Sequence, residues 1–350
     1  MRNSKNIIAV QPGATIREQL EGRGMKQKEF AQRMGLSEKH ISHLINGHVE
    51  LTYDVALRLE SVLGIPANFW NNLEIIYREK LARVIAENEL DRDIELVSLY
   101  PYSKMATLGW VAVTRKAEEK ALNLRRFFEV SKLDLIDGLK IPGILYRRTD
   151  ANDESDYNLA AWAQKARIEA RKHEIAPINI SKLEQIIPQI REMTVANPEV
   201  FCNGITKLLA ECGVALVFLP HIGESFLHGA SFIDSNHIVM GLTVRDKDVD
   251  KFWFGLLHEM CHIIRGHISG ISKTYEEMEF EADIFARDML IFPEQYNAFI
   301  KANCFSKDCI IAFAKKARIA PGIILGRLQK DNYVPYNRYN ELKVKYQIAC

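Results

Sequence analysis

The pattern of apolar and polar residues along this chain of 350 residues predicts helices over most of its length and strands in one region. Residues 14–63 divide at glycines into four short segments with helical patterns, and residues 66–95 continue as a longer one. Two apolar runs, VALVFLP at 214–220 and HIVMGLTV at 237–244, instead predict buried strands, the second paired with GASFI at 229–233 in a hairpin. We therefore expect a mainly α-helical protein with a small α+β part.

The second and third of the four N-terminal segments, KQKEFAQRMG and SEKHISHLING, predict a helix-turn-helix. They are short, they are joined by a tight glycine turn, and Ala31 and Ile41 occupy the packed positions. Ile41, Leu44 and Ile45 would face inward, which leaves a polar face of the third helix to enter the major groove of DNA. The alternative is a helical bundle used for contacts with another protein.

This segment resembles two known families. The helix-turn-helix resembles that of the Cro/cI-type, lambda-repressor-like regulators, and the continuation NGHVELTYDVALRLESVLGIPANFWNNLEIIYRE resembles HigA-type antitoxins. The resemblance implies a double-stranded DNA operator with two-fold symmetry, a homodimer, a possible toxin partner and a phosphate contact from the second helix. The candidate DNA-binding residues are Gln27 (the phosphate contact), Ser37, Glu38, Lys39, His40, Ser42 and His43.

A second motif, His258-Glu259-Met260-Cys261-His262, predicts a metal site. Residues four apart lie on one face of a helix, so His258 and His262 can bring two imidazoles to one ion. Glu259 projects beside that face, where it can take a proton from a water molecule that the ion activates. The H-E-x-x-H arrangement is typical of zinc-dependent hydrolysis.

A catalytic zinc site needs a third protein ligand, and the next predicted helix, residues 275–290, offers several carboxylates. Glu279 lies beside the apolar stripe of this helix, whereas Glu281 lies farther away on the other edge. We therefore expect Glu279 to be the ligand, with Glu281 as the alternative. Asp283, one turn after Glu279, is placed to hydrogen-bond a ligating histidine. The competing interpretation is that these acids form a solvated helix face.

The motif and its surroundings resemble the ImmA/IrrE family of metallo-endopeptidases. The family pattern is H-E-x-x-H, then E-x-x-A-[ND]-x-F-A, a hydrophobic run and a proline, and this chain has HEMCH, EFEADIFA and LIFP in that order. The resemblance implies a gluzincin-like fold with a small sheet against the zinc-binding helices. It also implies one Zn²⁺ per chain with Glu279 as a ligand, and a protein substrate such as a partner repressor.

Three residues near the motif carry weaker predictions. His228 or Tyr275 could stabilise an oxyanion, although each is more simply structural, and His267 is expected at the surface. The strand at 229–233 is the candidate edge that would pair with a substrate backbone.

Composition and charge bound the class of protein. The chain is 47% hydrophobic and 26% charged with a net charge of +1, which favours a globular protein over one that coats nucleic acid. Apolar runs are too short to span a membrane and the N-terminus lacks a signal-peptide core, so we expect a cytoplasmic protein whose six scattered cysteines are reduced. The expected domains are a helix-turn-helix domain at 1–80, a helical connector at 81–196, a zinc peptidase domain at 197–300 and a C-terminal helical segment at 301–350 packed on it.

These patterns together predict a cytoplasmic transcriptional regulator that binds DNA and cleaves a protein through a zinc centre, with Glu259 as general base. The alternative is a non-enzymatic, HigA-like antitoxin in which the zinc fold acts as a sensor or a structural piece. An open coordination position would favour the enzyme, and a closed site would favour the alternative.

Overall fold

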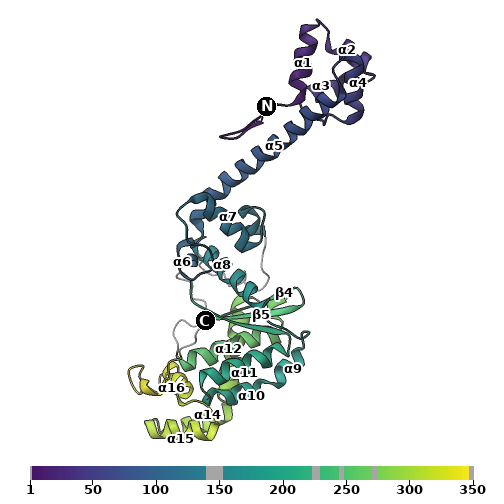
Figure 1. The fold of residues 1–350 in the computed structure, drawn as a ribbon. Helices are drawn as coiled ribbons and strands as arrows, with labels where there is room; N and C mark the ends of the chain where they lie inside the picture. The colour runs from purple at the N-terminus through teal and green to yellow at the C-terminus, as the bar shows by residue number, and fades with distance from the viewer. Residues whose placement is uncertain (1, 139–152, 223–228, 244–247, 270–273, 347–350) are drawn as a thin grey trace. The chain divides into compact units, whose positions relative to one another are not determined.

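The computed structural model divides the chain into two compact units (Figure 1). The first comprises Met1–Leu96 with Lys116–Ala121, and the second comprises Val97–Arg115 with Leu122–Cys350. The structure describes residues 2–138, 153–222, 229–243, 248–269 and 274–346. Within these ranges, no helix combines the length and the apolarity that crossing a membrane requires.

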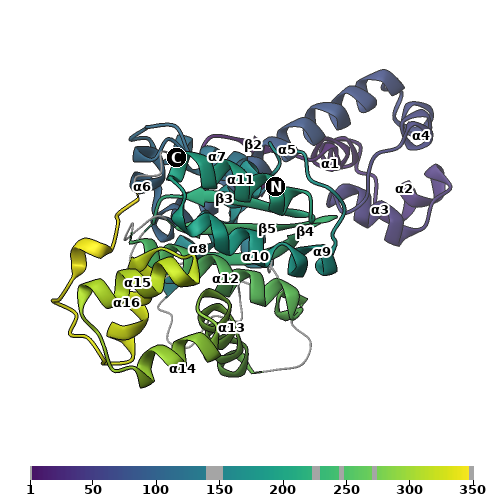
Figure 2. The ribbon, with the colours of Figure 1, turned by 90° about the horizontal axis from the view of Figure 1, so that it is seen from below.

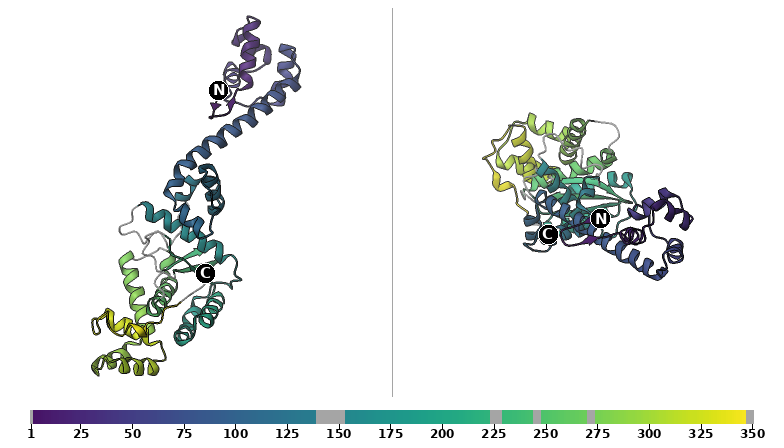
Figure 3. Two further views of the ribbon diagram at one scale, coloured as in Figure 1. Left: turned by 60° about the vertical axis from the view of Figure 1, so that its left-hand side comes forward. Right: turned by 90° about the horizontal axis from the view of Figure 1, so that it is seen from above.

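The first unit is a helical bundle that ends in one long helix (Figure 3). Its elements are the short strands β1 (Arg2–Asn3) and β2 (Ile8–Ala9) and the helices α1 (Pro12–Gly22), α2 (Gln27–Met34), α3 (Glu38–Ile45), α4 (Tyr53–Leu63) and α5 (Ala67–Leu96). The four short helices predicted from the sequence are present as α1 to α4. The expected domain boundary at residue 80 falls inside α5, which is continuous.

Local signals in the sequence set the ends of the helices in this bundle. The Ser37 hydroxyl accepts a hydrogen bond from the backbone N–H three residues later and so caps α3. Gly35 ends α2 in the left-handed region, with φ 65°. Ile41 is fully buried in a core that also contains Phe30 and Ala31. The predicted orientation of α3, with its apolar side inward, is therefore confirmed.

The second unit holds the remaining helices and a three-stranded sheet. Its helices are α6 (Tyr102–Thr107), α7 (Ala117–Phe128, shared with the first unit), α8 (Asp153–Ala170), α9 (Ile180–Gln185), α10 (Ile187–Glu192), α11 (Pro198–Ala210), α12 (Val249–Ile264), α13 (Tyr275–Leu290), α14 (Pro293–Lys301), α15 (Lys307–Ala317) and α16 (Pro321–Lys330). Its strands are β3 (Val214–Leu219), β4 (Gly229–Asp234) and β5 (His237–Thr243).

The sheet forms a layer between helices, with the strand order β3-β5-β4 (Figure 2). β5 is parallel to β3 and antiparallel to β4, so the predicted hairpin is confirmed and β4 is an edge strand. Alternate side chains point to opposite faces of a sheet. The face that includes Met240 packs in one core with α11 and α12. α8 packs against the other face, where a Cβ on Gly241 would collide with the ring of Trp162.

Most of the segment predicted as a connector, from Val97 onward except Lys116–Ala121, belongs to this same unit. α8 covers the sheet, and Leu183 of α9 and Ile190 of α10 belong to the same hydrophobic core as Trp253 of α12. The division of the chain therefore differs from the four expected domains. The physical reason is that the apolar faces of these helices are buried on the sheet and on α12, which a free spacer would leave in water.

The C-terminal helices α14, α15 and α16 belong to the second unit, where α16 contacts α12. Cys304 and Cys309 are joined by a disulfide, with their Cα atoms 6.1 Å apart. The expectation that all cysteines are reduced is wrong at this pair, because the turn between α14 and α15 brings the two Cα atoms within bridging distance. Among the described residues, Cys202, Cys212 and Cys261 are not joined in disulfides.

Candidate metal centre

α12 carries the H-E-x-x-H motif along a helix whose opposite side is buried. Val249, Trp253 and Leu257 recur at intervals of four and pack this helix into the core. α13 lies against α12. It begins with a capping box, in which the side chains of Thr274 and Glu277 each accept a hydrogen bond from the other residue's backbone N–H. These two helices fix the positions of the side chains that face each other between them.

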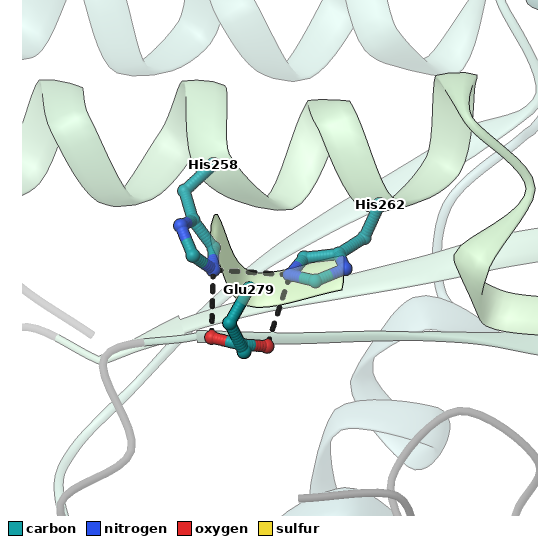
Figure 4. A group of neighbouring side chains, drawn as sticks. All are labelled: His258, His262 and Glu279. Atoms are coloured by element: carbon teal, nitrogen blue, oxygen red, sulfur yellow. Dashed lines mark hydrogen bonds and ion pairs between the residues drawn. The ribbon is translucent and has the colours of Figure 1, made fainter. Parts of the chain in front are cut away.

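The structure brings the three predicted metal ligands to one point (Figure 4). Nε2 of His258 lies 3.0 Å from Nε2 of His262. The carboxylate of Glu279 spans both rings, with Oε2 3.3 Å from Nε2 of His258 and Oε1 3.2 Å from Nε2 of His262. Figure 4 shows both imidazoles descending from α12 toward the carboxylate.

This arrangement fits a zinc ion. Two atoms that bind one tetrahedral zinc ion at 2.0–2.1 Å lie about 3.3 Å from each other, close to the three separations observed here. Two imidazole nitrogens with one carboxylate form a donor set found in hydrolytic zinc sites, which leave the fourth position for water or substrate. The side chains of His258 and His262 are 13% and 9% exposed and that of Glu279 is 29% exposed, so the cluster is largely shielded from solvent.

Carboxylates around His258 favour a positive charge at this point. Nδ1 of His258 lies 3.1 Å from Oδ1 of Asp283, the contact expected from the sequence. Burial by itself lowers the pKa of His258, but the hydrogen bonds to Asp283 and Glu279 and the charge of Glu259 outweigh it and raise the pKa to about 9. The hydrogen bond from His258 in turn lowers the pKa of Asp283. Ionised Asp283 accepts a hydrogen bond from Nδ1–H of His258, so Nε2 is the nitrogen that can lose its proton and bind a cation.

Glu259 is confined between the motif helix and the edge strand β4. Its residue exposure is 2%, and it is not one of the three clustered ligands. The hydroxyl of Ser231 on β4 donates to Oε2 of Glu259 at 2.9 Å. A Cβ built on Gly229, two residues earlier on the same face of β4, would lie 2.9 Å from Cγ of Glu259. Sequence reasoning missed Ser231, although its alternation with Gly229 along the predicted edge strand was a usable signal.

The expectation that His267 lies at the surface is wrong, and the alternative ligand Glu281 lies outside the cluster. His267 is buried, and its Nδ1 lies 3.1 Å from Nδ1 of His262. It is not at the surface because Gly266, with φ 71°, ends the turn after α12 and brings the chain back against the helix. Glu281, the alternative ligand, faces Nε2 of His267 at 3.3 Å and Nε of Arg265 at 3.4 Å, away from the cluster.

The other candidates around the site stay predictions. Tyr275 is partly buried in the first turn of α13. His228 lies outside the described residues. The candidate substrate strand at 229–233 lies within β4, which is at the edge of the sheet as expected.

The helix-turn-helix presents most of its predicted polar face to solvent. Glu38 and Lys39 at the start of α3 are exposed, and Ser42 and His43 farther along it are partly exposed. Gln27, the first residue of α2, is exposed as a phosphate contact requires. These side chains are available to DNA in the way the sequence predicts.

Two of the candidate DNA contacts differ from the rest. The Ser37 hydroxyl is engaged in capping α3. Nε2 of His40 is buried and has no hydrogen-bond partner within the part of the chain that the structure describes. Both side chains are therefore less available to a base edge than Lys39.

The bundle and its exposed polar helix define a helix-turn-helix protein, and comparisons with known proteins agree. A helix-turn-helix family model matches residues 16–70. The chain is 33% identical over 63 residues to YddM of Escherichia coli (strain K12), an uncharacterised HTH-type transcriptional regulator, and the match covers 18% of this chain and 67% of that protein. Through this domain, the chain belongs to the helix-turn-helix family of regulators.

Antitoxins of the HigA type are similar to the same N-terminal part of the chain. The chain is 42% identical over 57 residues to antitoxin HigA-1 of Vibrio cholerae, which covers 16% of this chain and 53% of HigA-1, so the chain spans about half of that relative. A solved HigA-family addiction module antidote protein from Coxiella burnetii has 26% identity, covers 24% of this chain and 92% of its own, and has a TM-score of 0.22. Each likeness spans less than a quarter of the chain, so the metal centre must be interpreted from its own geometry.

Proposed function

We propose that this helix-turn-helix protein binds a DNA operator and that its second unit is a zinc-dependent endopeptidase of the ImmA/IrrE kind. The observation that carries the enzymatic part is the convergence of His258, His262 and Glu279 on one point, with Glu259 buried beside the edge strand. A homodimer on a two-fold operator would suit a single recognition helix per chain. DNA binding and cleavage would together control transcription, the second by removing a protein.

The residues of the site divide the chemistry between them. When bound, zinc supplies Lewis acidity, which lowers the pKa of water and polarises a peptide carbonyl. Glu259 accepts the proton of the attacking water and returns it to the leaving amine. Ser231 donates a hydrogen bond to Oε2 of Glu259 and so holds the carboxylate beside β4. Asp283 holds His258 with its Nε2 directed into the site.

The edge strand supplies a place for a substrate. Among the described residues β4 pairs with β5 alone, so the backbone of an extended peptide can add to its other side. Ser231 connects this strand to Glu259, so a peptide held along β4 passes near the general base. The substrate class is therefore an extended segment of a protein, such as a partner repressor.

The decisive experiment compares the parent with Glu259→Gln. The amide is nearly isosteric and accepts the Ser231 hydrogen bond, but it cannot take a proton from water at neutral pH. We expect one equivalent of zinc, unchanged affinity for a DNA site selected from a random library, and a cleavage rate lower by about 10²- to 10⁴-fold. The variant should also retain the substrate in a pull-down, which identifies the protein whose cleavage is then measured.

Two further variants bracket this comparison. Glu279→Ala should lose zinc and cleavage together, because only two protein ligands remain. Glu276→Ala removes an exposed carboxylate in the first turn of the same helix and should match the parent. If Glu259→Gln cleaves the captured protein at the parental rate, the enzymatic proposal is wrong.

The likeness to HigA-1 favours a second function, a non-enzymatic antitoxin that represses its own operator and binds a toxin. The metal cluster would then act as a sensor or a structural piece. A reporter under the operator separates the two functions in cells. The antitoxin function is favoured if the reporter is still derepressed in the Glu259→Gln variant but is no longer derepressed when a co-purifying toxin is present.

A further inference from the structure

We infer that His267 and Glu281 form a relay that positions the metal ligand His262, an inference that rests on the proposed zinc site. The relay lies on the side of His262 opposite the cluster, because Nε2 of that ring faces His258 and Glu279 while Nδ1 faces His267. His262 and His267 are both buried, at 7% and 8% exposure, and their ring centroids lie 5.2 Å apart.

The distances allow one consistent arrangement of protons. A metal at the cluster takes the Nε2 lone pair of His262, so the proton of that ring is on Nδ1. Nδ1 lies 3.1 Å from Nδ1 of His267, which must therefore accept and must carry its own proton on Nε2. Nε2 of His267 in turn lies 3.3 Å from Oε2 of Glu281, within ion-pair distance, although the two groups are not aligned as a hydrogen bond. Arg265 completes the chain, with Nε 3.4 Å from Oε1 of Glu281.

This arrangement explains why two acids of α13 lie near the motif without binding the metal. His258 reaches a carboxylate directly, through Asp283, whereas His262 reaches one through the ring of His267. Both histidines are thereby held in the tautomer that presents Nε2. His267 and Glu281 are positioning residues, and their removal should weaken zinc binding without abolishing it.

The test measures zinc affinity by competition with a chelator for the parent protein and four variants. His267→Phe keeps a ring in the buried space and removes the acceptor for His262. His267→Asn leaves a void but places an oxygen near the position of Nδ1. We expect zinc affinity to fall by about 10- to 100-fold in His267→Phe and to recover most of that loss in His267→Asn. Glu281→Ala should weaken affinity in the same direction, against Glu276→Ala as the matched control on α13.

The order of the two His267 variants separates positioning from packing, because a packing role predicts that the smaller Asn is the more harmful. The absorption spectrum of the cobalt-substituted protein gives a second readout, and it should change in His267→Phe and resemble the parent in His267→Asn. Zinc affinity of His267→Phe equal to the parent, or an Asn variant weaker than the Phe variant, overturns the relay. Should Phe prevent folding, Asn and Glu281→Ala decide the question. A parent that binds no zinc refutes the proposed metal site itself, a result distinct from any difference between variants.

Discussion

At the scale of single residues, Gly229 and Ser231 fix the position of the Glu259 carboxylate. Both residues lie on the face of β4 that points to α12. Gly229 has no side chain and so leaves room for Glu259, and Ser231 donates a hydrogen bond to it. A Cβ on Gly229 would lie 2.8 Å from Cδ2 of Leu242 and 2.9 Å from Cγ of Glu259, closer than atoms normally approach. The space for the general base therefore depends on a glycine in a strand.

We predict that Gly229→Ala displaces Glu259 and lowers the cleavage rate while zinc stays bound, because the ligands lie outside this contact. Overpacking of this kind costs about 1–3 kcal/mol of stability. The matched control is Gly255→Ala on α12, where an added Cβ meets nothing within 4 Å and helix propensity favours alanine. Cleavage assays and thermal melts of both variants check the prediction. Equal cleavage by Gly229→Ala and the parent would mean that β4 does not constrain the base.

At the scale of elements, α14 and α16 are tied together by the carboxylate of Asp331. The hydroxyl of Tyr296 on α14 donates to Oδ2 of Asp331 at 2.6 Å, and Nε of Arg327 on α16 donates to the same oxygen at 2.7 Å. Burial opposes the charge of Asp331, but these two hydrogen bonds outweigh it and lower its pKa. Because the pKa is lower in the folded protein, the carboxylate stabilises the fold above its ordinary pKa and loses this effect as the pH falls.

We therefore predict that Asp331→Asn destabilises the second unit by about 1 kcal/mol at pH 7. The difference from the parent should be constant from pH 7 down to about 5 and should shrink as the pH falls below about 4, where the parental carboxylate takes up a proton. Urea unfolding at several pH values measures this trend. Asp308→Asn, at an exposed position in the first turn of α15, serves as the control. A difference that grows toward low pH would contradict the assignment.

The recognition helix carries the second prediction at this scale. Lys39→Ala or His43→Ala should reduce the preference for the selected DNA site over random DNA, since base contacts specify sequence. Gln27→Ala should weaken binding to both DNAs alike, as expected for a phosphate contact. Titrations of labelled DNA at two salt concentrations distinguish these effects. If all three variants bind both DNAs as the parent does, the bundle serves protein contacts instead.

At the scale of the whole molecule, the chain forms two units whose hydrophobic cores are separate. Phe30, Ile41 and Leu59 belong to the core of the first unit, while Trp253 and Leu257 belong to that of the second. The candidate DNA contacts lie in the first unit and the metal cluster in the second. Zinc that binds only the folded second unit should therefore stabilise that unit alone.

We predict that zinc at one hundred times its dissociation constant stabilises the second unit by about 2.7 kcal/mol and leaves the unfolding of the first unit unchanged. Removal of zinc with a chelator should not change the affinity for DNA. Scanning calorimetry with and without zinc, paired with DNA titrations of the same samples, tests this independence. A change in DNA affinity upon zinc removal would show that the two units are coupled.

Some features of this protein follow from the sequence alone because they depend on neighbours along the chain. The helices of the bundle, the left-handed glycine after α2 and the cap at Ser37 are local, and so is the pairing of His258 with His262 at i and i+4 on one helix. The amphipathic spacing of α13 also pointed to Glu279 rather than Glu281, and the structure places Glu279 at the cluster.

Other features were decided only by tertiary packing. Helical spacing in the middle of the chain shows that a helix has an apolar side, but it does not show what covers that side. For example, Trp162 of α8 packs on Gly241 of the sheet, which the sequence did not predict. His267 follows α12 by a few residues and looked exposed, yet a turn folds it against His262 and opposite Glu281. Ser231 meets Glu259 across 28 residues of sequence. The hydrophobic pattern of a segment reflects its own local conformation. It therefore does not show which distant segment it will contact, and only the three-dimensional fold brings the two together.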